Sequence, residues 1–163
     1  MKLRTILVIA AFVVVAAGWY LFRPERLFVN ARVNEGFPAG KTASADASPV
    51  TLFEGKFHDV AHKGVGTAAI HQLSDGKRVL RFTDFETSNG PDVRVYLVAA
   101  QDATDNDTVT KSGFLELGAL KGNIGDQNYD VPAETDLSKY KAVTIWCKRF
   151  GVNFATAPLA PRS

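Results

Sequence analysis

The chain has 163 residues, a formal net charge of +2, 46% hydrophobic residues and 22% charged residues. This length is enough for one domain of ordinary size with short accessory segments. The small net charge and the scattered basic residues argue against a nucleic-acid partner. The single cysteine excludes an intramolecular disulfide and any Cys-x-x-Cys redox or zinc motif.

The N-terminal region contains an apolar run over residues 5–22, between the basic start at 1–4 and a charged Arg-Pro-Glu-Arg stretch. About 18 helical residues, each rising ~1.5 Å, are long enough to cross a hydrocarbon core of ~30 Å. We predict a single-pass transmembrane anchor at 5–22 in the plasma or inner membrane. Residues 1–4 are then cytoplasmic, and the C-terminal domain lies on the outer side. The alternative is a cleaved signal peptide, with small residues at 16–18 as the cleavage site.

The segment 23–49 is predicted to be a juxtamembrane stretch followed by a flexible linker. Residues 41–48 are small and polar without periodicity, a composition that buries too little apolar area to fold. This stretch is preceded by the apolar residues Leu27, Phe28, Val29 and Val33. They either lie on the membrane surface or dock on the domain, and the sequence leaves both alternatives open.

From residue 50 onward the apolar residues recur with a period of two, which is typical of half-buried β-strands. The predicted strands are 51–57, 64–73, 78–85, 93–98, 114–120, 142–149 and 151–155. We predict turns at 74–77 and 89–92, where Asp-Gly or Asn-Gly occurs. Residues 100–112, 122–129 and 130–132 are predicted loops or turns, and 137–140 one helical turn, without an amphipathic helix. The predicted fold class is all-β, with an antiparallel β-sandwich at 50–159 behind the single N-terminal transmembrane helix.

The strand at 142–149 carries the single cysteine, Cys147. Its alternation places Val143, Ile145 and Cys147 on one apolar face, and Thr144, Trp146 and Lys148 on the other. One interpretation is a small buried hydrophobic residue, which is common for free cysteines. The other is a reactive thiol near a strand end, where the positive charges of Lys148 and Arg149 favour the thiolate form. In an oxidising compartment this unpaired thiol is exposed to oxidation. The residues alone leave both open.

Other candidate site residues are weaker. Asn89 and Asp92 belong to a predicted turn at one end of the sandwich, where loops often carry function. With Trp146 and His62 they are the weak binding candidates. His58, His62 and Cys147 offer metal-ligand types, but their spacing does not enforce a site, and we predict no metal site. The sequence does not tell whether a cofactor binds. It shows no catalytic triad and no carboxylate pair, so it does not predict an enzyme on its own.

Several stretches together resemble the electron-transfer DM-thirteen domain family. They are Gly55-x-Phe57, then His62 with Gly66, Ala68 and Ile70, Leu80-x-Phe82-x-x-Phe85, Asn89-Gly90-Pro91-Asp92-Val93-x-Val95-Tyr96-Leu97, Leu117-Gly118-x-Leu120-Lys121-Gly122-Asn123-x-Gly125-x-Gln127-Asn128-Tyr129, and Ile145-Trp146-Cys147-Lys148-x-Phe150-x-Val152-x-Phe154-x-x-Ala157-x-Leu159. The resemblance covers about 51–159. It implies an all-β extracytoplasmic module in which the family's redox-active cysteine is Cys147. The short anchor with one domain is similar to stand-alone, membrane-anchored bacterial members.

Two functional hypotheses follow from this resemblance and from the residues. In the first, the domain takes part in electron transfer or thiol redox chemistry with a membrane or surface redox protein. Cys147 then passes through a sulfenate, a mixed disulfide, or a metal- or haem-bound thiolate. In the second, the domain is a non-catalytic ligand- or protein-binding (adhesion) module with a structural, buried cysteine. The accessibility of the Cys147 sulfur distinguishes them.

Overall fold

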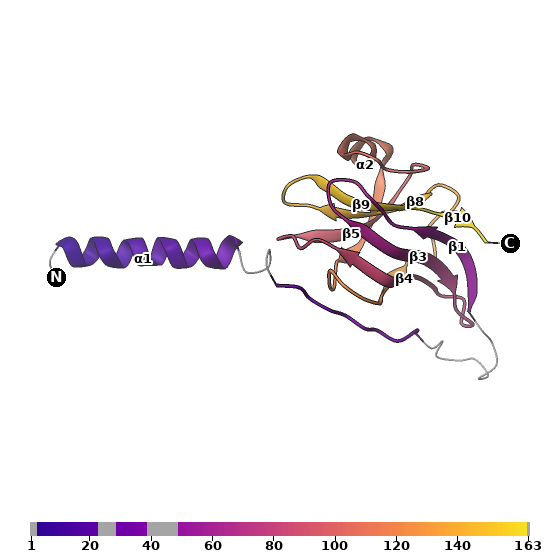
Figure 1. The fold of residues 1–163 in the computed structure, drawn as a ribbon, viewed down its shortest axis with the longest axis horizontal. Helices are drawn as coiled ribbons and strands as arrows, with labels where there is room; N and C mark the ends of the chain where they lie inside the picture. The colour runs from indigo at the N-terminus through magenta and orange to yellow at the C-terminus, as the bar shows by residue number, and fades with distance from the viewer. Residues whose placement is uncertain (1–2, 23–28, 39–48, 163) are drawn as a thin grey trace.

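The computed structural model describes residues 3–22, 29–38 and 49–162. A helix, α1 (Leu3–Phe22), precedes two five-stranded antiparallel sheets that pack face to face (Figure 1). The first sheet has the order β10 (Ala160–Pro161), β1 (Val50–Lys56), β3 (Gly64–Gln72), β4 (Arg78–Thr87) and β7 (Gln127–Val131). The second has the order β2 (His58–Asp59), β9 (Val152–Pro158), β8 (Ala142–Cys147), β5 (Val93–Val98) and β6 (Phe114–Ala119). The predicted all-β sandwich class is confirmed.

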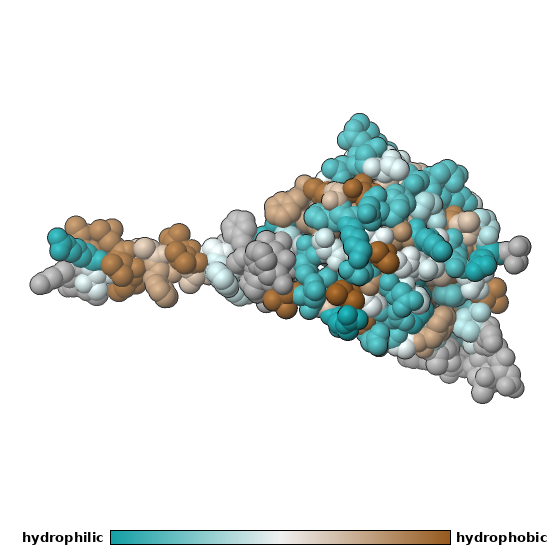
Figure 2. All heavy atoms as spheres, viewed as in Figure 1, coloured by the Kyte–Doolittle hydropathy of each residue, from teal (hydrophilic) through white to brown (hydrophobic). Residues whose placement is uncertain are grey.

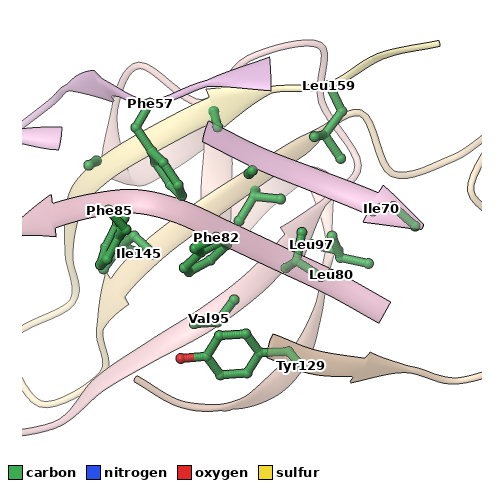
Figure 3. Packing of buried hydrophobic residues seen from close by; sticks show 14 of the residues in the cluster. Phe57, Ile70, Leu80, Phe82, Phe85, Val95, Leu97, Tyr129, Ile145 and Leu159 are labelled. Atoms are coloured by element: carbon green, nitrogen blue, oxygen red, sulfur yellow. The ribbon is translucent and has the colours of Figure 1, made fainter. Parts of the chain in front are cut away.

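The hydrophobic core lies between the two sheets and is built from the inward-facing residues of both. Three aromatic rings form its centre: Phe57 and Phe82 have centroids 5.0 Å apart, and Phe85 lies 4.9 Å from Phe57. Leu80 and Phe82 of the first sheet point toward Leu97 and Ile145 of the second (Figure 3). Full burial of side chains of this size stabilises the fold by roughly 2 kcal/mol each.

The turn predicted at 74–77 is confirmed and links β3 to β4. Leu73 N donates to Lys77 O at 2.8 Å, and Gly76 has a φ of +82°. A positive φ is readily adopted by glycine, which explains the Asp-Gly signal. The alternating strand at 93–98 is also confirmed, as β5, which lies between β8 and β6.

Two predictions of irregular structure are wrong. The predicted loop at 100–112 contains a short helix, α2 (Asn106–Ser112), whose first turn is capped by the Asp105 carboxylate accepting from Thr108 N. The predicted turn at 122–129 and loop at 130–132 contain β7, because residues 127–131 all pair with residues 78–82 of β4. Residues 137–139 form a turn, in which Lys139 N donates to Asp136 O.

Helix α1 has 20 residues, which is about 30 Å of helix. Among the described residues it is the helix that is long and apolar enough to cross a bilayer, and a signal sequence meets the same criteria. Its surface is mostly hydrophobic, whereas the visible face of the sandwich is mostly hydrophilic with separate hydrophobic spots (Figure 2). The predicted flexible stretch 41–48 lies outside the described residues.

Residues 31–37, which we call the strap, run in extended form along the domain (Figure 1). Val33 N donates to Ile124 O at 2.9 Å, Ile124 N to Ala31 O at 3.3 Å, and Glu35 N to Asp126 O at 2.9 Å. The strap is thus parallel to the chain just before β7. Of the two alternatives for Val33, docking on the domain is the one observed.

Candidate functional site

Cys147 is the last residue of β8 and is fully buried, with an exposed fraction of 0%. Val143, Ile145 and Cys147 all belong to the core between the sheets, as their shared face predicts. In the antiparallel register Cys147 lies opposite Val93 of β5 and Val152 of β9. The turn that follows, residues 148–151, is exposed. The thiol is therefore buried, but at the edge of the core.

The opposite face of β8 is also buried, which the alternation did not predict. Trp146 packs with Tyr96, Val98 and Val109 in a second apolar cluster beneath α2. Beside it, the hydroxyl groups of Thr144 and Thr156 hydrogen-bond to each other at 3.1 Å. Trp146 therefore lies on the side of the sheet away from Cys147. The structure does not bring these two candidate residues together.

Two adjoining clefts lie at the end of the sandwich where the 89–92 turn is located. The Asp92 cleft, of about 490 Å³, is lined by residues 29, 31, 88–94 and 119–123. The His62 cleft, of about 540 Å³, is lined by Asn30, His62, residues 86–89, Asn123 and Ile124. Three of the four binding candidates therefore line one end of the domain: Asn89, Asp92 and His62.

Val93 connects the Asp92 cleft with the position of the thiol. Val93 lines this cleft and is directly opposite Cys147 across the β5–β8 pair. Directly opposite residues project from the same face of a sheet with Cβ atoms about 5 Å apart. The backbone also connects the two features, because Lys148 N donates to Asp92 O at 2.8 Å. A movement of the 148–151 turn would thus affect both the cleft wall and the thiol.

The charged side chains beside the thiol are paired with one another. Arg94 Nε donates to Asp92 Oδ1 at 2.6 Å, and Arg94 Nη1 to Glu116 Oε1 at 3.1 Å. The hydrogen bond to Asp92 is the main reason that the pKa of Arg94 is raised. Lys148 Nζ donates to the second oxygen of Glu116 at 3.1 Å. The Lys148 charge that the sequence placed next to Cys147 is therefore compensated by a carboxylate.

The side chains of His58 and His62 contact other residues of the domain and do not form a metal site with Cys147. His62 stacks its ring on Phe154, with centroids 3.9 Å apart. The His58 ring bridges Asp59 O and the Asp102 carboxylate, each at 2.9 Å from a different ring nitrogen. Two acceptors favour the doubly protonated ring, and although burial lowers the pKa of His58, these hydrogen bonds raise it overall. Among the described residues, no three His, Cys, Asp or Glu side chains are grouped to hold a metal ion.

A small asparagine cluster between the two clefts was not identified from the sequence. Asn123 is buried and donates to Asn30 Oδ1 at 3.0 Å and to Thr87 O at 3.1 Å. Its own Oδ1 accepts from Ala31 N at 2.8 Å, and Asn89 Nδ2 donates to the same Asn30 oxygen at 2.9 Å. The Gly-Asn-x-Gly sequence around Asn123 signals a turn, but not a partner more than 90 residues away in the chain.

The comparison with known protein families agrees with the resemblance found in the sequence. A family model described as "Electron transfer DM13" matches residues 56–159, which is more than half of the chain. The matched range contains β2 through β9, Cys147, and the 88–94 and 119–123 walls of the Asp92 cleft. No curated protein and no solved structure matches the chain. The chain belongs to the DM13 (DM-thirteen) electron-transfer family.

Proposed function

We propose that the protein is a membrane-tethered electron-transfer module on the outer side of the plasma or inner membrane, with the Cys147 thiol as its redox group. Membership of the electron-transfer DM13 family and the apolar helix α1 support the proposal. The observation that carries it is the position of Cys147, at a strand end directly opposite Val93, which lines the Asp92 cleft.

The chemistry proposed is thiol–disulfide exchange with a disulfide of a partner protein. The Cys147 thiolate attacks one partner sulfur, so that a Cys147–partner disulfide forms and the partner's own disulfide breaks. The leaving sulfur departs as a thiolate and takes up the proton that Cys147 has lost. The Cys147 sulfur is oxidised and the leaving sulfur is reduced. A second thiol of the partner system then attacks the partner sulfur of the mixed disulfide, so that a disulfide forms between these two sulfurs, the Cys147–partner bond breaks, and Cys147 leaves as the thiolate and regains a proton.

Because Cys147 is buried, this reaction requires local opening at the end of β8. The closing contact there is the hydrogen bond from Gly151 N to Cys147 O, at 2.9 Å, across an exposed turn. Val152, opposite Cys147 on the other side, is only half-buried. Local openings of this kind need less free energy than global unfolding. The fold therefore combines a protected thiol with a short route to it.

The test is the reaction of the full-length protein with oxidised glutathione as the model disulfide. We expect a glutathione adduct on Cys147 under native conditions, faster than the protein unfolds globally, and no adduct on Cys147→Ala. An adduct that forms only in denaturant would overturn the redox role. Alkaline carbonate extraction of membranes and the intact mass of the N-terminus test the anchor separately, because a cleaved signal peptide releases a shorter chain.

A second function is favoured by the complete burial of Cys147. In it the domain binds a ligand or protein through the clefts without chemistry, and the thiol fills the core. Free cysteines are often such small core residues. This function predicts that native Cys147 is inert toward glutathione, and that Cys147→Ala changes stability but no binding property.

A further inference from the structure

The strap is held by side chains as well as by its backbone. The Glu35 carboxylate accepts from Lys121 Nζ at 2.8 and 3.0 Å and from Asn128 N at 2.7 Å. Asn128 Nδ2 donates in return to Gly36 O at 2.9 Å. At its end, the Phe37 ring packs edge-on against His71, with centroids 4.9 Å apart. These contacts involve successive residues of the strap and fix its register on the domain.

The domain surface has a shape that fits the strap. A Cβ atom added to Gly122 would come within 2.5 Å of Ala31 O, and one added to Gly125 within 2.1 Å of Val33 O. Real Cβ atoms essentially never approach so closely. Both glycines thus leave the space that the strap backbone occupies. The strap is therefore a built-in part of the fold, although it precedes the first strand of the sandwich by more than ten residues.

Docking of the strap shortens the tether to the helix. From Phe22 to Ala31 there are nine residue steps, which span at most about 30 Å when fully extended. If the chain were undocked as far as residue 49, the same limit would be roughly 90 Å. The last residues of this short tether also line the clefts, namely Val29, Asn30 and Ala31. The chain that follows α1 therefore reaches the sandwich at its cleft end.

We propose that the strap holds the cleft end toward the bilayer, and that the Asp92 cleft docks the extramembrane surface of an integral protein of the same membrane. The inference rests on the proposed membrane tethering. A domain held within about 30 Å of the bilayer meets partners in that membrane at high effective concentration, whereas diffusing partners gain nothing from the tether.

The charges at the cleft end favour a protein surface over anionic lipid. Four basic side chains there are paired with carboxylates: Lys63 with Glu86, Arg94 with Asp92 and Glu116, Lys121 with Glu35, and Lys148 with Glu116. Arg32 of the strap is a fifth basic residue at this end and is exposed. An anionic bilayer attracts an excess of unpaired basic residues, which these pairs do not supply. Val29 and Phe150, which are 64% and 63% exposed, add apolar area of the kind that protein interfaces bury.

The orientation is tested with two matched labels. Ser88→Cys places a fluorophore at the clefts, and Ser74→Cys places one at the β3–β4 turn. Strand β3 runs between these two ends of the sheet, and its nine residues give a separation of about 25 Å. Both are made in full-length Cys147→Ala protein, reconstituted in phosphatidylcholine vesicles that carry a headgroup quencher. We expect several-fold stronger quenching at position 88 than at 74. Equal quenching at the two positions would overturn the proposed orientation.

The strap itself is tested in the same assay. Glu35→Ala removes the carboxylate that joins the strap to Lys121 and Asn128, so the difference between the two labels should shrink. Glu134→Ala changes an exposed glutamate in a different turn and should leave the difference intact. A difference that survives Glu35→Ala together with Gly122→Ala would show that the strap does not set the orientation.

The partner is tested with a benzophenone on the same two cysteines in native membranes. We expect adducts to carbonate-resistant membrane proteins from position 88, lost in Glu35→Ala and absent from position 74. Capture supports docking only with this dependence on position and strap. Adducts to lipid alone, equal adducts at both positions, or none overturn it. Release of the chain by carbonate would instead show that the proposed membrane anchor is wrong. A chain that stays in the membrane but shows no preferred orientation would contradict this inference alone.

Discussion

Replacement of Gly151 by alanine should expose the Cys147 thiol more often without removing any side-chain contact. Gly151 has a φ of +63° and closes the turn next to Cys147. Its added Cβ would lie 3.9 Å from the Trp146 ring, an ordinary van der Waals distance, so the perturbation acts on the backbone alone. An alanine in this left-handed region costs about 1–2 kcal/mol. If the turn opens locally, native labelling of Cys147 by a maleimide should accelerate roughly 5- to 30-fold.

Gly76→Ala is the matched control for this experiment. Gly76 has a φ of +82° in the β3–β4 turn, and an added Cβ meets nothing within 4 Å. Its cost for global stability should therefore be similar, but at a distance from Cys147. If the thiol is reached by local opening, labelling accelerates in Gly151→Ala and stays close to wild type in Gly76→Ala. Equal acceleration in both variants would refute the reasoning, because it would mean that the thiol reacts only from the globally unfolded chain.

Three further predictions concern the stability of the domain. The pKa of His58 is raised in the fold, so its pair with Asp102 stabilises the folded state below the unfolded pKa of about 6.5. This stabilisation is lost as the pH rises through the folded pKa. Asp102→Asn should therefore flatten the pH dependence of the free energy of unfolding, measured in urea between about pH 5 and 8. Tyr129→Phe should cost about 1 kcal/mol in the same assay, whereas Gln127→Leu, which leaves buried backbone groups unpaired, should cost about 2–3 kcal/mol; equal costs would contradict the network. Asp105→Ala should speed amide exchange in α2 and leave exchange in the β-strands unchanged, and protection retained in α2 would show that the cap is dispensable.

The parts of the fold that were predictable are those in which local chemistry and tertiary packing agree. The β3–β4 turn has its Asp-Gly pair, and β5 has alternating apolar residues that face the core. By contrast, α2 has seven residues with one buried side chain, Val109, so it shows no helical period. Strand β7 contains Gln127 and Asn128, which are residue types typical of turns. In the structure Gln127 is buried in the strand, where its side-chain amide is hydrogen-bonded. Propensity is a weak prior where packing decides the structure.

The inward position of Cys147 was predictable from the sequence, but the arrangement of the candidate site around it was not. Alternation correctly placed Cys147 on the inward face of β8. It also placed Trp146 on an outward face, which the structure buries because α2 and its loop cover that side. A period of two cannot reveal a cover supplied by a separate segment. The clefts likewise depend on pairing between segments more than 90 residues apart, such as Ala31 with Asn123, for which one sequence holds no local signal.

The order in which the strap is synthesised gives it a role in the timing of folding. The strap is made before every strand that it contacts, and its partners Asn123 and Asn128 follow it by 92 or 93 residues. Contacts of such long range form late, because the intervening chain must first be ordered. During synthesis the strap is therefore undocked, and the tether between Phe22 and the domain extends as far as residue 49. It shortens to the segment before Ala31 only when the sandwich is complete. In the proposed membrane-tethered protein, an unfinished or misfolded domain could therefore lie up to roughly 90 Å from the bilayer, and only a finished one would be held within about 30 Å of it.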